Sequence, residues 1–118
     1  MKNQSFTRRL TFALAGVRTA WRTENSFKFQ VAAAIAALCA LLWWRPAPGW
    51  WALMALVVAA VLAAELFNTA IEHLTDHLHP ESHPAIKIVK DCAAGAVLIT
   101  SIAAIAVAIA FAYDVVFG

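Results

Sequence analysis

Apolar residues fill long stretches of this chain, and short polar segments separate the stretches. Residues 27–44, 50–72 and 86–113 are dominated by Ala, Val, Ile, Leu and aromatic side chains. A helix needs about 20 apolar residues to cross the roughly 30 Å hydrocarbon core of a bilayer. Two prolines within residues 45–49 interrupt the first two stretches, because proline lacks a backbone donor and restricts the residue before it. The pattern predicts three transmembrane helices, and the helix that starts at Trp50 is expected to stay helical through Glu72 and to extend to about His77.

A different pattern marks residues 6–22, where apolar and cationic positions segregate with helical periodicity. On a helix, Phe6, Leu10, Ala13, Leu14, Val17, Ala20 and Trp21 share one face, while Arg8, Thr11, Arg18 and Arg22 share the other. Such a helix is typical of the headgroup layer, with its apolar side toward the acyl chains. A soluble amphipathic helix packed on a core is the alternative.

The composition favours the membrane interpretation. The chain is 63% hydrophobic and 14% charged, whereas about half of an ordinary soluble domain is apolar. Its 118 residues are expected to form a single all-α membrane domain, 1–118. We expect no cleavable signal, because the first long apolar run starts only near Val31. Cys39 and Cys92 lie in apolar segments and are expected to be buried thiols, and no basic stripe suggests a nucleic-acid partner.

Positive charge orients the predicted helices. Of the nine Lys and Arg residues, only Arg45 falls on one side of the three spans. The others are Lys2, Arg8, Arg9, Arg18, Arg22, Lys28, Lys87 and Lys90. Cationic segments stay in the cytoplasm, so the N-terminus and residues 73–90 are expected there. An aromatic belt is expected at the opposite interface, made of Trp43, Trp44, Trp50, Trp51, Phe111, Tyr113 and Phe117.

Polar side chains interrupt the second span near its cytoplasmic end. At 100° per residue, Glu65, Asn68, Glu72 and Asp76 fall within an arc of about 80°. Ionisable groups within a span are costly and typically mark function. Glu24 precedes the first span, and Lys90 and Asp91 open the last. Folding should therefore bring all these groups to one depth.

This set of side chains favours phosphoryl transfer. Carboxylates suit Mg²⁺, which also accepts substrate phosphates as ligands. A lysine beside the metal suits the phosphates of a nucleotide, and a further, partly buried carboxylate could act as general base. The acceptor would arrive from the lipid. The four glycines are isolated, so a glycine-rich phosphate loop is not part of this interpretation.

Three segments resemble the prokaryotic diacylglycerol kinase family, which includes the undecaprenol kinases. They are Glu-Leu-Phe-Asn-Thr-Ala-Ile-Glu at 65–72, Lys-Asp-Cys-Ala-Ala-Gly-Ala-Val-Leu at 90–98 and Arg-Thr-Glu-Asn at 22–25. The resemblance covers almost the whole chain in order. It implies a homotrimer in the bacterial cytoplasmic (inner) membrane, with a surface helix, three spans per subunit and active sites shared between subunits at the cytoplasmic interface.

The resemblance also implies roles for individual residues. Glu65 matches the catalytic base that deprotonates the lipid hydroxyl, and Glu24 and Glu72 match ligands of the Mg²⁺ that accompanies ATP. Other matched positions are Asn68, a polar active-site residue, Lys90 on the nucleotide phosphates, Asp91 near the nucleotide, and Asp76 in nucleotide or metal binding. Gln30 departs from the acidic or imidazole side chain expected there. The amphipathic pattern of residues 6–22 suggests that this helix gates entry of the lipid head.

Alternatives remain for the acceptor and for the class of protein. Diacylglycerol, converted to phosphatidic acid, is the first candidate acceptor, and undecaprenol is the second, favoured by Ala93, Ala94, Gly95 and Ala96. A small proton-coupled multidrug exporter also has a glutamate within the membrane, but it would have four spans and no surface helix. Glu65 and Glu72 could form a structural seam between spans, and the Lys90–Asp91 pair could merely snorkel to the interface. The four histidines, His73, His77, His79 and His83, could bind zinc.

Overall fold

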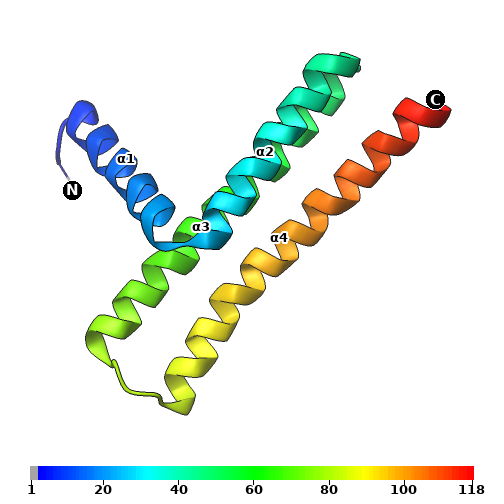
Figure 1. Ribbon diagram of the computed structural model, residues 1–118. Helices are drawn as coiled ribbons and strands as arrows, with labels where there is room; N and C mark the ends of the chain where they lie inside the picture. The colour runs from blue at the N-terminus through cyan, green and yellow to red at the C-terminus, as the bar shows by residue number, and fades with distance from the viewer. Residues whose placement is uncertain (1–2) are drawn as a thin grey trace.

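The computed structural model describes residues 3–118 and is helical throughout its regular structure. Its four helices are α1 (Phe6–Thr23), α2 (Asn25–Trp44), α3 (Pro48–Leu78) and α4 (Pro84–Phe117). α2, α3 and α4 run as long rods beside one another, and α1 diverges from them near the start of α2 (Figure 1). The predicted all-α fold is confirmed, since α2, α3 and α4 are each long and apolar enough to cross a membrane. Lys2 lies outside the described residues.

Local sequence signals explain where the helices begin and end. The hydroxyl of Ser5 caps α1 by accepting a hydrogen bond from the backbone N–H of Arg8 at 3.3 Å. Glu24, in extended conformation, separates α1 from α2. α2 ends at Arg45, whose φ of 46° is left-handed. α3 and α4 both begin with proline, which suits the first turn because its missing N–H has no partner there.

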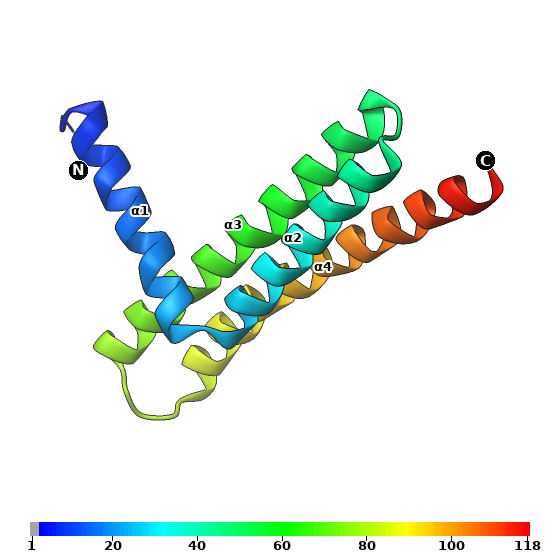
Figure 2. The same ribbon diagram turned by 45° about the horizontal axis from the view of Figure 1, so that its top comes forward.

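α3 is longer than the apolar stretch that predicted it. The expected apolar span covered residues 50–72 with helix to about His77, and the helix runs unbroken for 31 residues to Leu78. At 1.5 Å per residue it is about 46 Å long, which exceeds the roughly 30 Å hydrocarbon thickness. The polar residues after Glu72 do not break a helix, and the next proline is Pro80. The α3–α4 end of the molecule therefore projects beyond the α1–α2 junction (Figure 2).

The buried core is small and lies near the end of the bundle that holds the α2–α3 connection. Leu41, Met54 and Phe111 form it, one from each long helix. The ring of Trp50 packs edge-on against Phe111, with centroids 5.5 Å apart. These contacts join α2, α3 and α4 at the end opposite the α3–α4 loop.

Most of the remaining apolar surface faces outward. On α4 alone, the exposed large apolar residues are Ile88, Val89, Leu98, Ile99, Ile102, Ile105, Ile109, Tyr113, Val116 and Phe117. A surface of this kind suits a hydrocarbon solvent. Cys39 and Cys92 lie on such outward faces and are exposed and free, so the expectation that both are buried is wrong. Small apolar thiols meet no penalty there, because lipid surrounds the helices.

α1 stands apart from the bundle and touches it only near its C-terminal end. Ala20 is fully buried at this junction. The Lys28 ammonium of α2 lies 5.7 Å from the centroid of the Trp21 ring. Farther along the helix, Phe6 and Leu14 of the apolar face are exposed. This placement leaves the apolar side of α1 exposed, and its insertion in a membrane interface stays a prediction.

Candidate functional site

Glu65 is the most completely buried side chain of its size in α3, at 1% exposure. The hydroxyl of Ser26, in the first turn of α2, donates to its Oε2 at 2.9 Å. Its other oxygen, Oε1, is buried without a hydrogen-bond partner among the described residues. Buried carboxylate oxygens are rarely left unpaired in proteins. Oε1 is therefore available to a donor that is not part of this chain.

Asn68 and Glu72 continue the polar face of α3 toward the α3–α4 loop. Asn68 Nδ2 donates to Glu72 Oε1 at 3.2 Å. The amide oxygen of Asn68 is buried and, in the part of the chain described, accepts no hydrogen bond. Asn68 and Glu65 are three residues apart on one helical face. They present two buried acceptors that a hydroxyl or a water molecule could satisfy.

Glu24 brings a further carboxylate to this cluster from the α1–α2 junction. Partial burial raises the pKa of its carboxyl above the ordinary 4.5, and the nearby carboxylates of Glu72 and Glu65 raise it further. His73 opposes the shift. The effect of Glu72 and Glu65 on the Glu24 pKa shows that carboxylates of α3 lie near the α1–α2 junction.

The carboxylates of Glu24 and Glu72 suit a hard divalent cation whose remaining ligands come from a bound nucleotide and water. No group of three or more His, Cys, Asp or Glu side chains in residues 3–118 is arranged to hold a metal alone. Glu24 and Glu72 supply two carboxylates whose mutual repulsion a cation would relieve. Mg²⁺ usually takes one or two protein carboxylates and completes its shell with phosphate oxygens and water. The donor set therefore fits Mg²⁺ on a nucleotide better than a closed protein site.

Asp76 and Lys90 form an ion pair farther along α3. Lys90 Nζ lies 2.5 Å from Asp76 Oδ1, and both side chains are partly exposed. Asp76 follows Glu65 by eleven residues, which is about 16 Å along the helix axis. The polar groups are thus spread along α3 and do not lie at one depth, because α3 continues as a helix past the membrane-spanning stretch.

Asp91 does not contact the polar residues of α3 described above and pairs with Lys87 of its own helix. Its carboxylate accepts a hydrogen bond from Lys87, one helical turn away, at 2.6 Å, and both side chains are exposed. The predicted neighbours Lys90 and Asp91 therefore have different partners. The rings of His79 and His83 contact each other with centroids 5.4 Å apart. Within the described residues, however, the histidines are not part of any group of three or more side chains that could bind zinc.

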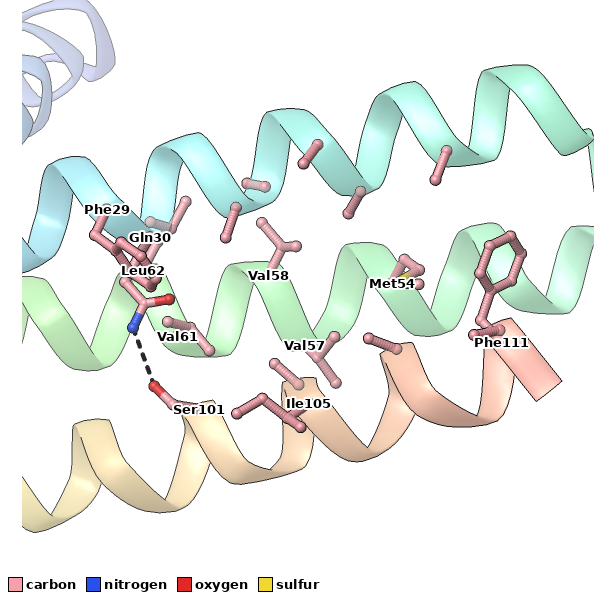
Figure 3. A pocket seen from close by; sticks show the side chains of 18 of the residues that line it. Phe29, Gln30, Met54, Val57, Val58, Val61, Leu62, Ser101, Ile105 and Phe111 are labelled. Carbon is pink, nitrogen blue, oxygen red and sulfur yellow. Dashed lines mark hydrogen bonds between the residues drawn. The ribbon is translucent and has the colours of Figure 1, made fainter.

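An apolar groove of about 660 Å³ runs between α2, α3 and α4 (Figure 3). Its walls include Val58, Val61 and Ile105. The amide of Gln30 crosses the groove and donates to the hydroxyl of Ser101 at 3.1 Å. Gln30 lies one helical turn beyond Ser26, so the groove begins next to the level of Glu65.

Sequence reasoning overlooked three polar residues that the fold brings into or beside the site. Ser26 contacts Glu65, Ser101 pairs with Gln30, and Lys87 pairs with Asp91. A signal for the first was present, since Ser26 and Gln30 are four residues apart and share a face of an otherwise apolar helix. Ser101 gave no comparable signal, because a lone serine in a membrane helix commonly bonds its own backbone.

Known proteins of one family are similar to this chain over most of its length. A sequence model of the prokaryotic diacylglycerol kinase family matches residues 11–112. The chain is 35% identical to the undecaprenol kinase of Bacillus subtilis (strain 168) over 97 residues, which cover 82% of this chain and 79% of that enzyme.

A second relative is the diacylglycerol kinase of Synechocystis sp. (strain ATCC 27184 / PCC 6803 / Kazusa). It is 38% identical over 97 residues, covering 81% of this chain and 55% of that enzyme. The matched region spans all three candidate membrane helices almost completely and includes every residue of the polar series from Glu24 to Asp91. The chain therefore belongs to the prokaryotic diacylglycerol kinase family and is a lipid kinase.

Proposed function

We propose that this protein transfers the γ-phosphoryl group of ATP to the primary hydroxyl of a membrane lipid at the cytoplasmic face of a bacterial inner membrane. The observation that carries the proposal is the state of Glu65: a carboxylate inside an apolar helix, with one oxygen anchored and the other without a donor. A buried carboxylate oxygen that the described residues leave without a donor needs a partner from outside the chain. A lipid hydroxyl is a donor that could reach it from the bilayer.

In the proposed reaction, Oε1 of Glu65 accepts the proton of the lipid hydroxyl. The lipid oxygen forms a bond to the γ-phosphorus of ATP while the bond from that phosphorus to the bridging oxygen breaks. The products are the lipid phosphate and ADP, and Glu65 later releases its proton to water. Asn68, one turn away, offers a buried amide oxygen that a donor on either substrate could satisfy.

The charged groups toward the α3–α4 loop would bind the nucleotide. Glu24 and Glu72 would hold Mg²⁺, which when bound neutralises charge on the phosphates. Lys90 would contact the phosphates, with Asp76 and Asp91 near the nucleotide. The spread of about 16 Å from Glu65 to Asp76 along α3 suits an extended ligand that meets the lipid hydroxyl at one end.

The acceptor has two candidates. Diacylglycerol, yielding phosphatidic acid, is the first. The similarity to an undecaprenol kinase, which extends over 79% of that enzyme's length, supports undecaprenol as the second. Either acceptor could lay hydrocarbon in the apolar groove that begins beside Glu65. The chemistry at Glu65 is the same for both.

Orientation and assembly complete the proposal. The cationic residues flanking the carboxylate cluster support a cytoplasmic N-terminus and α3–α4 loop. We propose a homotrimer with shared sites, which the resemblance to the family implies. It is also supported by the many outward apolar side chains of α2 and α4, which a neighbouring subunit could cover. Mass measurement of the detergent-solubilised protein tests the trimer directly.

The central experiment compares purified protein on diacylglycerol and on undecaprenol with ATP labelled at the γ-phosphate. Label should move to at least one of the lipids, and the ratio of kcat/KM values identifies the acceptor. Glu65→Gln should abolish transfer while ATP still binds. Glu81→Gln, which changes an exposed carboxylate in the α3–α4 loop, is the matched control and should keep full activity. Undiminished transfer by Glu65→Gln would refute the base assignment.

A further inference from the structure

The hydrogen bond between Ser26 and Glu65 joins two helices at the proposed reaction centre. Ser26 is the second residue of α2, and 39 residues separate it from Glu65 in α3. Its hydroxyl lies 2.9 Å from Oε2 of the carboxylate. This is the one side-chain hydrogen bond that the described residues give Glu65, since Oε1 has none.

We propose that Ser26 is a positioning residue for the catalytic carboxylate: its hydroxyl fixes Oε2 of Glu65 so that Oε1 faces the lipid hydroxyl. The inference rests on the proposed role of Glu65 as general base. A glutamate side chain has three rotatable bonds and considerable rotamer freedom. A hydrogen bond from the Ser26 hydroxyl to the carboxylate, at 2.9 Å, restricts this freedom.

The two oxygens of Glu65 thereby acquire different tasks. Oε2 is held by Ser26, and Oε1 is left as the acceptor with an unfilled hydrogen-bonding position. Without the serine hydroxyl, both oxygens would lack a donor from the described residues. The carboxylate could then rotate among several orientations, only some of which place an oxygen toward the lipid.

The placement of Ser26 also links the base to the nucleotide end of the site. Glu24, the proposed metal ligand, lies two residues before it, and its carboxyl senses both Glu72 and Glu65. The three-residue segment 24–26 therefore contacts the base with one side chain and approaches the metal-binding carboxylates with another. Packing of the start of α2 against α3 would therefore position the general base and the metal-binding carboxylates at the same time.

A second interhelical hydrogen bond provides a control that distinguishes positioning of Glu65 from a general contribution to helix packing. Gln30, one turn farther along α2, donates to Ser101 of α4 at 3.1 Å. This bond also ties α2 to a neighbouring helix through a serine hydroxyl, but it does not touch Glu65. Ser101→Ala is therefore a matched control for Ser26→Ala: each change removes one interhelical hydrogen bond and one hydroxyl.

The test measures kcat and both KM values for Ser26→Ala, Ser26→Thr and Ser101→Ala in the full-length protein, with ATP and whichever lipid the wild-type protein phosphorylates. Misplacement of a catalytic group by about 1 Å can cost about 100-fold in rate. We expect kcat of Ser26→Ala to fall by about 10- to 100-fold, with the KM for ATP unchanged within about twofold. Ser26→Thr keeps the hydroxyl and should restore most of the rate. Ser101→Ala removes a hydroxyl that lines the groove but does not touch Glu65, so its kcat should fall much less than that of Ser26→Ala.

Several results would overturn the inference. They are a wild-type kcat for Ser26→Ala, an equal loss in Ser26→Ala and Ser101→Ala, or no rescue by Ser26→Thr. Helix content from circular dichroism and the elution volume in detergent identify any variant that fails to fold, and Ser26→Thr then provides the comparison.

Glu65→Gln, measured in parallel, distinguishes this inference from the proposed function. If Glu65→Gln is inactive and Ser26→Ala is unaffected, only the role of Ser26 is wrong. If Glu65→Gln is active, the base assignment itself is wrong. The double variant should be no worse than Glu65→Gln alone, because Ser26 acts through the carboxylate.

Discussion

Lys90 of α4 and Asp76 of α3 are joined by an ion pair of 2.5 Å across the α3–α4 turn. Lys90 is the residue proposed to contact the nucleotide phosphates, and its ammonium pairs with the carboxylate of Asp76. Both side chains are partly exposed, and an exposed ion pair typically contributes less than about 1 kcal/mol. A triphosphate could therefore recruit the lysine at small cost, while Asp76 keeps it near the site.

Lys90→Ala should weaken nucleotide binding much more than it weakens the fold. We expect the KM for ATP to rise at least tenfold, because a charge-assisted hydrogen bond to phosphate is worth about 1.5–3 kcal/mol. The free energy of unfolding should fall by less than about 1 kcal/mol. Steady-state kinetics and thermal unfolding in detergent measure the two effects.

Lys87→Ala is the matched control, since Lys87 also pairs with an aspartate but is exposed and belongs to no proposed contact with substrate. Its KM for ATP should stay within about threefold of wild type, less than 1 kcal/mol at the 1.4 kcal/mol per tenfold conversion. Equal effects of the two lysine substitutions would mean that general positive charge at the loop, and not Lys90, attracts the nucleotide.

Glu24→Gln should stabilise the protein while it removes activity. Partial burial and the carboxylates of Glu72 and Glu65 raise the pKa of the Glu24 carboxyl, so its negative charge at neutral pH is unfavourable in the folded state. Glu24 is the N-cap residue of α2, but its side chain makes no capping hydrogen bond, so the substitution removes no capping interaction. Solvent screening limits the gain to about 1 kcal/mol or less. Thermal unfolding at pH 7 measures it.

The pH dependence of this gain follows from the direction of the pKa shift. As the pH falls through the raised pKa, the folded protein takes up a proton that the unfolded chain binds only near 4.5. The repulsion at Glu24 then disappears, so the advantage of Glu24→Gln over wild type should shrink between pH 7 and about 4.5. A gain that is constant over this range would contradict the electrostatic explanation.

Metal dependence provides an independent readout of the same carboxylates. Chelation with EDTA should abolish phosphoryl transfer, and added Mg²⁺ should restore it. Mg²⁺ with a nonhydrolysable ATP analogue should raise the unfolding temperature of the wild-type protein, because ligands that bind only the folded state stabilise it. The rise should be smaller in Glu72→Gln. An equal rise in both proteins would place the metal elsewhere.

The helices could be predicted from the sequence because a segment that crosses the lipid hydrocarbon must be almost entirely apolar. Uninterrupted apolar stretches predicted α2, α3 and α4, and the separation of arginines from apolar residues predicted α1. The end of α3 could not be read from hydropathy. Hydropathy reports the width of the membrane, whereas helix ends depend on breakers, and none occurs between Glu72 and Pro80.

The polar series could be predicted for a related reason: ionisable residues stand out in an apolar helix. Helical periodicity correctly placed Glu65, Asn68 and Glu72 on one face, and the fold brings Glu24 to them. The partners Ser26 and Ser101 were not predictable individually, because interhelical register decides which small hydroxyl meets which side chain. The pairing of Asp91 with Lys87 needs no interhelical register, because the two residues lie four apart on α4, and helical spacing alone would have indicated it.

Replacing apolar residues of α1 should affect the lipid substrate selectively. Leu10 and Leu14 lie on the exposed apolar face of this helix, away from the bundle. The double variant Leu10→Asp/Leu14→Asp should raise the KM for lipid severalfold and leave the KM for ATP unchanged, because each charge opposes insertion in the interface. Thr7→Asp/Thr11→Asp changes charge equally on the same helix and is the control. Deletion of residues 1–20 without loss of activity would exclude a gating role for α1.

The opposite end of the bundle allows stability to be changed without touching catalysis. The indole N–H of Trp50 donates to Asp114 at 3.1 Å, and the same ring packs against Phe111. Trp50 is fifteen residues before Glu65, about 22 Å along α3. Trp50→Phe keeps an aromatic ring but loses the donor and part of the packing surface. It should lower the free energy of unfolding by about 1–2 kcal/mol.

Activity measurements should show that the contacts of Trp50 with Asp114 and Phe111 affect stability and not catalysis. We expect kcat and both KM values of Trp50→Phe to match wild type at a temperature well below unfolding, because its contacts lie at the far end of the helices. Tyr113→Phe, which removes the hydroxyl of an exposed ring in α4, should change neither stability nor activity. If Trp50→Phe destabilises no more than Tyr113→Phe, the bond to Asp114 contributes nothing. A fall in kcat for Trp50→Phe alone would mean that the two ends of α3 are coupled through the helix packing.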